Sequence, residues 1–240
     1  MKRLLGLLLM LVGLSAGCAT KFFVNVDALS VPEAATAQKY VLLPGAEDIS
    51  SDDLRFKEFC VYLNRALVSK GFVPAEGMDS ADAAIFVSYA IGDPKEHVYS
   101  YSIPHFGQTG ISSSTTYGSV QSTGNYGTFS GTTTYQPSYG ITGYSSHVRT
   151  CVTYTRWLSL VACDLAAYRR EKKVVELWRV TAVSTGSSGD LRQVFPILVA
   201  AVRPHLAENT DKKSITVTFR ENDEDVIRIR DGDAALADKK

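Results

Sequence analysis

The sequence lacks charge over a long central stretch. Residues 97–148 contain no Asp, Glu, Lys or Arg, although these residues make up 21% of the chain. The chain also lacks an excess of charge of either sign, because 25 basic residues are matched by 25 acidic ones. This balance does not indicate nucleic-acid binding or a general attraction to anionic lipid. After residue 17 no apolar run approaches the roughly 20 residues of a membrane-spanning helix, so no permanent span is predicted there.

Signatures of catalysis are missing as well. The chain has no Gly-x-Ser-x-Gly elbow and no glycine-rich phosphate loop followed by lysine. His97, His105 and His147 could converge at the base of the uncharged stretch, but no acidic residue or cysteine completes a recognisable metal-site spacing. The sequence therefore predicts no catalytic residue, no metal site and no cofactor. A hydrolase or metal-dependent enzyme is the least favoured class of function.

Cysteine is scarce, with four in the chain. Cys60, Cys151 and Cys163 lie in apolar surroundings and suit buried thiols that pack as small hydrophobes. Three thiols also permit one disulfide with one cysteine left over, and the sequence alone leaves this open.

The N-terminus carries a secretion signal. Lys2 and Arg3 precede an apolar run over residues 4–14, and small residues at 15–17 lead to Cys18. This order is typical of a signal peptide. Leu-Ser-Ala-Gly-Cys resembles the lipobox of bacterial lipoproteins, which implies cleavage before Cys18 and acylation of that cysteine. Several acyl chains anchor a protein stably in a membrane.

The lipobox resemblance also implies a location. Lipoproteins retained at the inner membrane usually carry Asp after the lipidated cysteine, whereas this chain has Ala19. We therefore expect residues 1–17 to be removed, residues 18–21 to form a lipidated tether, and the protein to lie at the outer membrane facing the periplasm.

Apolar periodicity predicts an α+β domain over residues 22–220. Two helices are predicted around residues 56–67 and 191–202. Asp52 or Asp53 can cap the first, and Ser188 or Asp190 the second. The two helices are expected to pack on one face of a mixed, largely antiparallel sheet. The predicted strands are 22–26, 40–43, 83–91, 148–165, 174–184 and 214–220. The helix residues expected in the core are Phe59, Leu63, Leu67, Leu198 and Val202.

Two further segments complete the predicted organisation. Residues 168–173 are expected to form a charged turn, and residues 221–240 a charged C-terminal tail. Within that tail, residues 226–230 could add a short edge pairing.

The uncharged stretch is a β-prone insert over about residues 97–148, rich in Gly, Ser, Thr and Tyr. Eight of the 18 glycines lie between residues 107 and 143, and Tyr117, Tyr126, Tyr135 and Tyr144 recur every nine residues. Short β segments separated by glycine turns fit this spacing, as does a loose tandem duplication. A flexible Gly/Ser linker is the alternative, although linkers rarely carry so many aromatic side chains.

An ordered series of segments resembles a known family. The series comprises residues 40–45, a helix ending at 66–72, the strand 83–91 preceded by Ala81-Asp82, the strand around Trp178 and the helix 191–202. With the lipobox, this order resembles the bacterial lipoproteins that carry domain of unknown function 4136 (DUF 4136), over roughly residues 22–205. The resemblance implies an envelope lipoprotein with an α+β domain, and it implies no activity.

A non-enzymatic binding or envelope-assembly module is the function that the sequence favours. Uncharged surfaces of Tyr, Ser, Thr, Gly and Asn are typical of recognition surfaces, and Tyr117, Tyr126, Tyr135 and Tyr144 are the expected binding residues. The expected partners are the membrane, through Cys18, and an envelope protein or glycan; no nucleic acid is expected. A structural or oligomeric subunit of an envelope complex is the alternative.

Overall fold

The structure is a computed structural model that describes residues 20–32, 34 and 39–234. The predicted signal peptide and Cys18 lie outside the described residues. The chain divides into two compact units. The described residues up to Lys95 and from Val152 onward form the unit that we call the body, and Glu96–Cys151 forms the unit that we call the arm.

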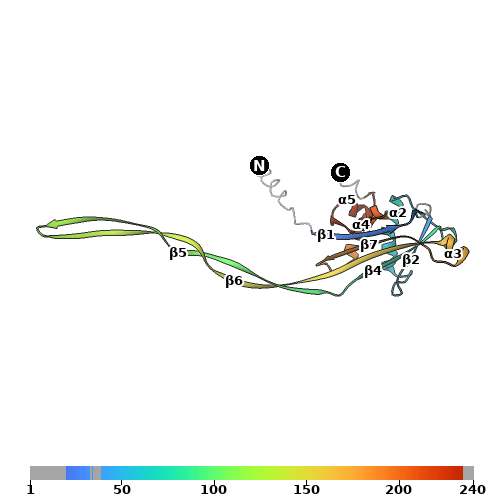
Figure 1. The fold of residues 1–240 in the computed structure, drawn as a ribbon, viewed down its shortest axis with the longest axis horizontal. Helices are drawn as coiled ribbons and strands as arrows, with labels where there is room; N and C mark the ends of the chain where they lie inside the picture. Colours follow the sequence, from blue (N-terminus) through green and yellow to red (C-terminus); the bar gives the residue numbers. More distant parts are fainter. Residues whose placement is uncertain (1–19, 33, 35–38, 235–240) are drawn as a thin grey trace, which may run out of the picture. The chain divides into compact units, whose positions relative to one another are not determined.

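The body contains a mixed, largely antiparallel sheet with strand order β3-β2-β4-β6-β7-β1-β8 (Figure 1). Strand β2 runs parallel to β3 and β4, whereas the other neighbours are antiparallel. The fold is therefore α+β, as the sequence predicts. The strands are β1 (Lys21–Ser30), β2 (Lys39–Pro44), β3 (Val73–Pro74), β4 (Ala83–Ile91), β6 (Tyr126–Asp164), β7 (Glu176–Gly186) and β8 (Ile215–Arg220).

Strict alternation in β1 shows how sequence fixes the faces of the sheet. Phe22, Val24, Val26 and Ala28 are buried, and the residues between them are exposed. Successive side chains of a strand point to opposite faces, so one face of β1 lies against the core and the other faces solvent.

The described residues contain four α-helices, where the sequence predicts two main ones. They are α2 (Leu54–Ser69), α3 (Leu165–Glu171), α4 (Leu191–Val202) and α5 (Glu224–Asp231), with short 3-10 turns η2 (Met78–Ser80) and η3 (Arg203–His205). Asp53 caps α2 by accepting from the Arg55 amide at 2.8 Å, and Asp190 caps α4 by accepting from the Arg192 amide at 2.9 Å. These carboxylates satisfy amides that have no partner inside the helix.

Helices α2, α4 and α5 share one hydrophobic core with the inward-facing strand residues. The predicted core residues Phe59, Leu63, Leu67, Leu198 and Val202 are all buried, which confirms this prediction. The rings of Phe59 and Phe195 stack with centroids 3.6 Å apart and planes 5° apart. Helix α4 contacts β1, β7, α2 and α5, which explains why apolar residues surround almost its whole circumference, Pro196 included.

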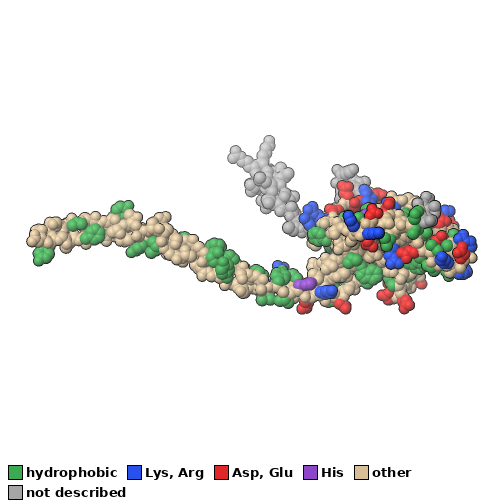
Figure 2. Space-filling view, viewed as in Figure 1, with side chains coloured by type: hydrophobic (Ala, Val, Ile, Leu, Met, Phe, Trp, Pro, Cys, Tyr) green, Lys and Arg blue, Asp and Glu red, His purple; other side chains and the backbone are tan. Residues whose placement is uncertain are grey.

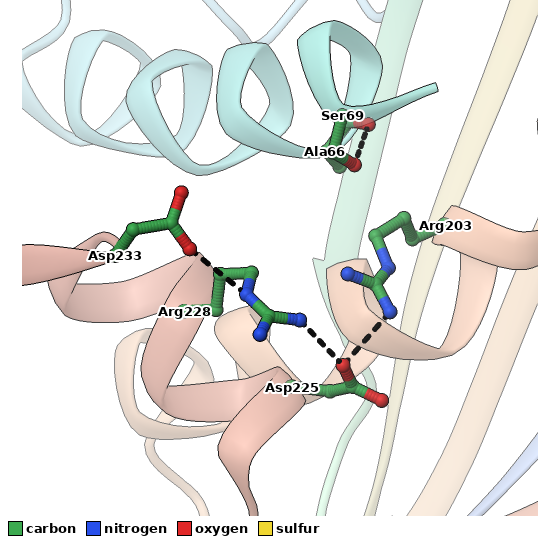
Figure 3. A network of polar contacts seen from close by, with 6 residues as sticks. All are labelled: Ala66, Ser69, Arg203, Asp225, Arg228 and Asp233. Atoms are coloured by element: carbon green, nitrogen blue, oxygen red, sulfur yellow. Dashed lines mark hydrogen bonds and ion pairs between the residues drawn. The ribbon is translucent and has the colours of Figure 1, made fainter. Parts of the chain in front are cut away.

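The predicted charged tail is wrong for residues 224–231. These residues form α5, and Val226, Ile227 and Ile229 are buried. Asp225 accepts from Arg203 at 2.8 Å and from Arg228 at 3.3 Å, while Arg228 also donates to Asp233 at 2.9 Å (Figure 3). The segment is a docked helix because its apolar residues recur on one side while its charges pair on the other.

The predicted charged turn at residues 168–173 also differs from the structure. Helix α3 covers most of it, capped by Asp164, which accepts from the Ala167 amide at 3.0 Å. Leu165 and Ala167 are buried, and the helix ends at Lys172 in the left-handed conformation, with φ of 56°.

No helix in the described part of the chain is long and apolar enough to cross a membrane.

The arm consists of β5 (Lys95–Thr123) paired with the first part of β6. The sequence predicts a β-prone insert of several short segments, whereas the structure has two long strands joined by a single two-residue turn, Gly124-Asn125. Gly124 has φ of 64°, and glycine at the first central position suits the tight turns that join antiparallel strands.

Candidate binding surface

The turn sets the pairing of the arm residue by residue. Thr123 and Tyr126 flank it, so Thr116 falls opposite Thr133, and their Oγ1 atoms are 2.8 Å apart. Gly107 falls opposite Thr142 in the same count, and a Cβ at Gly107 would lie 3.1 Å from the Thr142 side chain. One register therefore describes residues 107–142.

A glycine pair near the tip is covered by one aromatic ring. Gly118 lies opposite Gly131, and a Cβ on either would lie 2.5 Å or 2.7 Å from the Phe129 ring. The ring occupies the space that two side chains would otherwise fill, an arrangement that compensates for glycine in strands. Phe129 therefore stabilises the distal arm.

The arm has no core of its own. None of its residues is buried, and it exposes large apolar side chains that include Phe106, Val120, Phe129 and Tyr139. Figure 2 shows hydrophobic and uncharged polar atoms along the arm and charged side chains only near its base. A two-stranded hairpin alone is marginally stable in water, so the exposed side chains of the arm are candidates for contact with another molecule.

The four predicted binding tyrosines lie on the arm but do not form one stripe. Tyr117, Tyr126, Tyr135 and Tyr144 are between 60% and 85% exposed. Tyr117 lies on β5 and the others on β6. Nine is an odd number, so Tyr126 and Tyr135 point to opposite faces of their strand. Tyr117 lies opposite Thr132, and opposed residues share a face of the hairpin. Thr132 and Tyr126 are six residues apart on one strand, so Tyr117 and Tyr126 share that face. The repeat thus places aromatic rings on both faces.

The outer edges of the arm are a feature that sequence reasoning missed. In an antiparallel pair, alternate residues direct their backbone groups toward the partner strand or away from it. The pair flanking a two-residue turn faces inward, so the even-numbered residues of 107–123 and the odd-numbered residues of 126–142 face outward. Among the described strands, this part of β5 pairs with β6 alone and this part of β6 with β5 alone.

Pro137 supports this assignment of the outward positions. It lies within β6 opposite Ser112, at an outward-facing position. Proline has no N–H and is confined in sheets to edge positions whose N–H would not bond within the sheet. An odd-numbered proline in this strand, counted from the turn at Gly124-Asn125, is the sequence signal that identifies the outward-facing positions.

The histidines are not gathered into a metal site. His105 Nε2 contacts the Ser145 hydroxyl, while the His147 ring stacks on Tyr101 with centroids 5.7 Å apart. Within residues 20–32, 34 and 39–234 no group of three or more His, Cys, Asp or Glu side chains could hold a metal ion. The convergence considered from the sequence is therefore not seen among these residues.

The three described cysteines are free thiols. Burial raises the pKa of Cys60 to about 11 and also raises that of Cys163. A raised pKa keeps a thiol protonated and poorly nucleophilic at neutral pH, which fits packing roles. Cys151 lies at the base of the arm with its sulfur 3.6 Å from the Tyr99 hydroxyl.

The body has one buried arginine. Arg156 is 1% exposed and donates to the Ser188 carbonyl and to the Ser184 hydroxyl, both at 3.1 Å. Burial lowers the pKa of its guanidinium. These contacts tie β6 to the end of β7 and the loop before α4, which indicates a structural role.

A small apolar hollow lies beside α3. It has a volume of about 300 Å³ and is lined by nine residues, among them Leu43, Phe86, Leu165 and Tyr168. Its one carboxylate belongs to Asp164, which is already engaged in capping α3. The hollow is therefore mainly apolar, and its other groups that can exchange protons are the Cys163 thiol and the Tyr168 hydroxyl.

Comparisons with known proteins give no family. No family model and no curated protein matches the chain. A PDZ domain protein from Parabacteroides distasonis is similar with a TM-score of 0.39 and 8% identity, over 85% of this chain and 40% of that one. The lysenin pore is similar with a TM-score of 0.11 and 11% identity, over 83% and 48%. The chain spans less than half of each, and at these TM-scores neither similarity carries an argument about fold or function.

Replacing Gly118 by alanine should open the distal arm. The new Cβ would lie 2.5 Å from the Phe129 ring and 2.7 Å from the Ser130 carbonyl, and overpacking of this kind costs about 1–3 kcal/mol. We expect the amide hydrogens around residues 116–133 to exchange at least roughly tenfold faster than in the unsubstituted protein. Gly127→Ala is the matched control, since its Cβ would have no neighbour closer than 3.9 Å. Equal exchange in both variants would contradict the role assigned to Phe129.

Proposed function

We propose that this protein is an outer-membrane-anchored periplasmic lipoprotein that acts as a non-enzymatic binding or envelope-assembly module through its arm. In this proposal Cys18 carries the lipid anchor, Ala19 permits sorting to the outer membrane, and the arm supplies the binding surface. The lipobox and the resemblance to DUF 4136 lipoproteins support the location.

The observation that carries the proposal is the arm itself. Glu96–Cys151 exposes aromatic rings, hydroxyl groups and strand edges without burying a residue. Rigid aromatic side chains and adaptable hydroxyls favour recognition, and an exposed strand edge can accept a further strand. A surface of this composition can stack on sugar rings or pair with a β edge.

A structural or oligomeric subunit of an envelope complex is the second candidate, and the exposed edges of β5 and β6 favour it. The enzymatic alternative has less support, since the one carboxylate that lines the hollow beside α3 is engaged in capping that helix.

Replacing residues 106–146 by a short Gly/Ser connection should abolish partner capture and leave the body folded. None of the replaced residues is buried, so their removal should not open the core of the body. Loop-closure entropy also changes slowly with loop length. Full-length and arm-less proteins, both lipid-anchored, would be used for pull-down from solubilised envelopes and for retention on immobilised glycans. Fluorescence of the two tryptophans, Trp157 and Trp178, reports unfolding of the body.

A quadruple Tyr→Ser variant at the four tyrosines tests the aromatic rings separately, with the Tyr→Phe variant as its matched control. We expect Tyr→Ser to lose most of the capture and Tyr→Phe to keep it if ring stacking dominates. If the arm-less protein retains every interaction of the full chain, the proposed function is wrong.

A further inference from the structure

The outer edges of the arm fit one another. We propose that arms of separate copies of this chain pair edge to edge, with β5 of one arm beside β6 of the next. The inference rests on the proposed function, in which the arm is a contact site, and it identifies the partner as a second copy. Its basis is the juxtaposition of strand direction, outward-facing residues and absence of charge.

Strand direction permits the pairing. Within one arm, β5 runs toward the turn and β6 runs away from it. Two arms lying side by side with their tips aligned therefore place β5 of one antiparallel to β6 of the other. Residues 107–123 and 126–142 are equally long segments, so the ladder of the arm continues into the neighbour.

The positions of the outward backbone groups agree as well. Thr116 and Thr133 oppose each other within the arm and direct their backbone groups outward on opposite edges. With aligned tips, Thr116 of one copy faces Thr133 of the next, so the outward groups of both become partners. Each pair that is left without backbone bonds inside the arm thereby gains them between arms.

The lack of charge removes the usual obstacle to self-pairing. Like charges that face each other across paired strands are destabilising, and natural edges carry lysine to prevent such association. Residues 97–148 carry no Asp, Glu, Lys or Arg, so no stagger of the two arms opposes like charges. Thr and Tyr, which are frequent here, also favour cross-strand packing.

Pro137 limits the length of the pairing. It offers no N–H on the outer edge of β6, so the uninterrupted segments are residues 113–123 of one copy and 126–136 of the next. Eleven residues extend over about 35 Å and form on the order of ten hydrogen bonds. Each added copy leaves one β5 edge and one β6 edge free, so the assembly grows until it closes into a ring or continues as a filament.

Cysteine cross-linking tests the pairing in the full-length, lipid-anchored protein. Thr116→Cys and Thr133→Cys are made in separate copies, each in a Cys151→Ser background, and mixed in detergent before reconstitution and mild oxidation. Opposed residues on paired strands have Cα atoms about 5.5 Å apart, within the range for a disulfide. We expect a covalent dimer from the mixture and none from either variant alone.

Two further variants test the role of the backbone edge. Thr116→Pro removes an outward N–H, whereas Thr116→Val keeps it with a side chain of similar size. We expect the proline variant to reduce the size of the assembly in mass photometry and the valine variant to leave it unchanged. Equal behaviour of the two would contradict edge pairing.

The remaining outcomes separate this inference from the proposed function. Cross-linking of Thr116→Cys with itself would replace the proposed β5–β6 pairing by a two-fold β5–β5 contact and overturn it. No cross-link in the mixture, with arm-dependent capture of another envelope component intact, would refute self-pairing and leave the proposed function standing. Absence of both self-association and arm-dependent capture in the full-length protein would refute both the inference and the proposed function.

Discussion

Truncation of Phe59 to alanine should lower the free energy of unfolding by about 3–5 kcal/mol. Phe59 lies on α2 and is completely buried. Its ring stacks on Phe195 of α4 and meets Tyr89 of β4 edge-on, with centroids 4.9 Å apart. The substitution removes a ring from the place where two helices and the sheet meet, and the surrounding side chains cannot refill that volume. Urea denaturation followed by tryptophan fluorescence measures the effect.

Val61→Ala is the matched control for Phe59. Val61 lies on the same helix but is 46% exposed, so its truncation should change the free energy of unfolding by about 0.5 kcal/mol or less. Leu198→Ala on α4 should behave like Phe59→Ala, with a loss of about 2–5 kcal/mol. Losses below about 1 kcal/mol for both core variants would show that α2 and α4 do not share the described core.

Local periodicity was sufficient to predict most of the body. Strand β4 has the predicted bounds of Ala83–Ile91, and α4 those of Leu191–Val202. In β4 a nearly continuous apolar run reflects a strand with neighbours on both sides. In α2 and α4 the apolar spacing and a capping aspartate agree, and such agreement between independent signals makes a local prediction reliable.

Helices α3 and α5 were missed because their charges conceal short apolar faces. In α5, Val226, Ile227 and Ile229 are interspersed with Arg228 and Arg230. The helix also has acidic residues in its first turn and Gly232 at its end, where φ is 87°. These are start and stop signals of a helix. The apolar residues of this short helix are buried in the core despite the charged residues between them. This burial depends on contacts with distant parts of the chain, which local sequence does not show.

The arm could be predicted as β-prone but not as one hairpin. Glycine at eight positions between residues 107 and 143 suggests several turns, whereas the turn is at Gly124 alone and the other glycines lie within strands. Gly118 and Gly131 are covered by Phe129, and Gly107 and Gly140 face threonines. This compensation acts across the strands, so it becomes visible only when the register is known. The odd spacing of the tyrosine repeat places Tyr126 and Tyr135 on opposite faces only once both are known to lie in one unbroken strand.

Ending the chain after Arg220 should abolish cooperative folding of the body. The truncation removes α5 and with it Val226, Ile227 and Ile229, each at most 3% exposed. Burial of one such side chain contributes about 1.5–3 kcal/mol, so three contribute an amount comparable with the whole stability of a typical domain, about 5–15 kcal/mol. Arg65 would also lose the Ile229 carbonyl, to which it donates at 2.8 Å. Thermal unfolding followed by tryptophan fluorescence should show no sharp transition.

A chain ending after Ala234 is the matched control, because it keeps α5 and the Arg228–Asp233 ion pair and should unfold like the full-length protein. The arm replacement provides the opposite comparison. It removes 41 residues without a buried side chain, whereas the truncation after Arg220 removes 20 residues that include part of the core. Stability should follow the buried apolar surface and not the number of residues removed. The chain that ends after Arg220 could instead unfold cooperatively, with a free energy of unfolding within about 1 kcal/mol of the control. That result would show that α5 is dispensable and that the segment behaves as a tail.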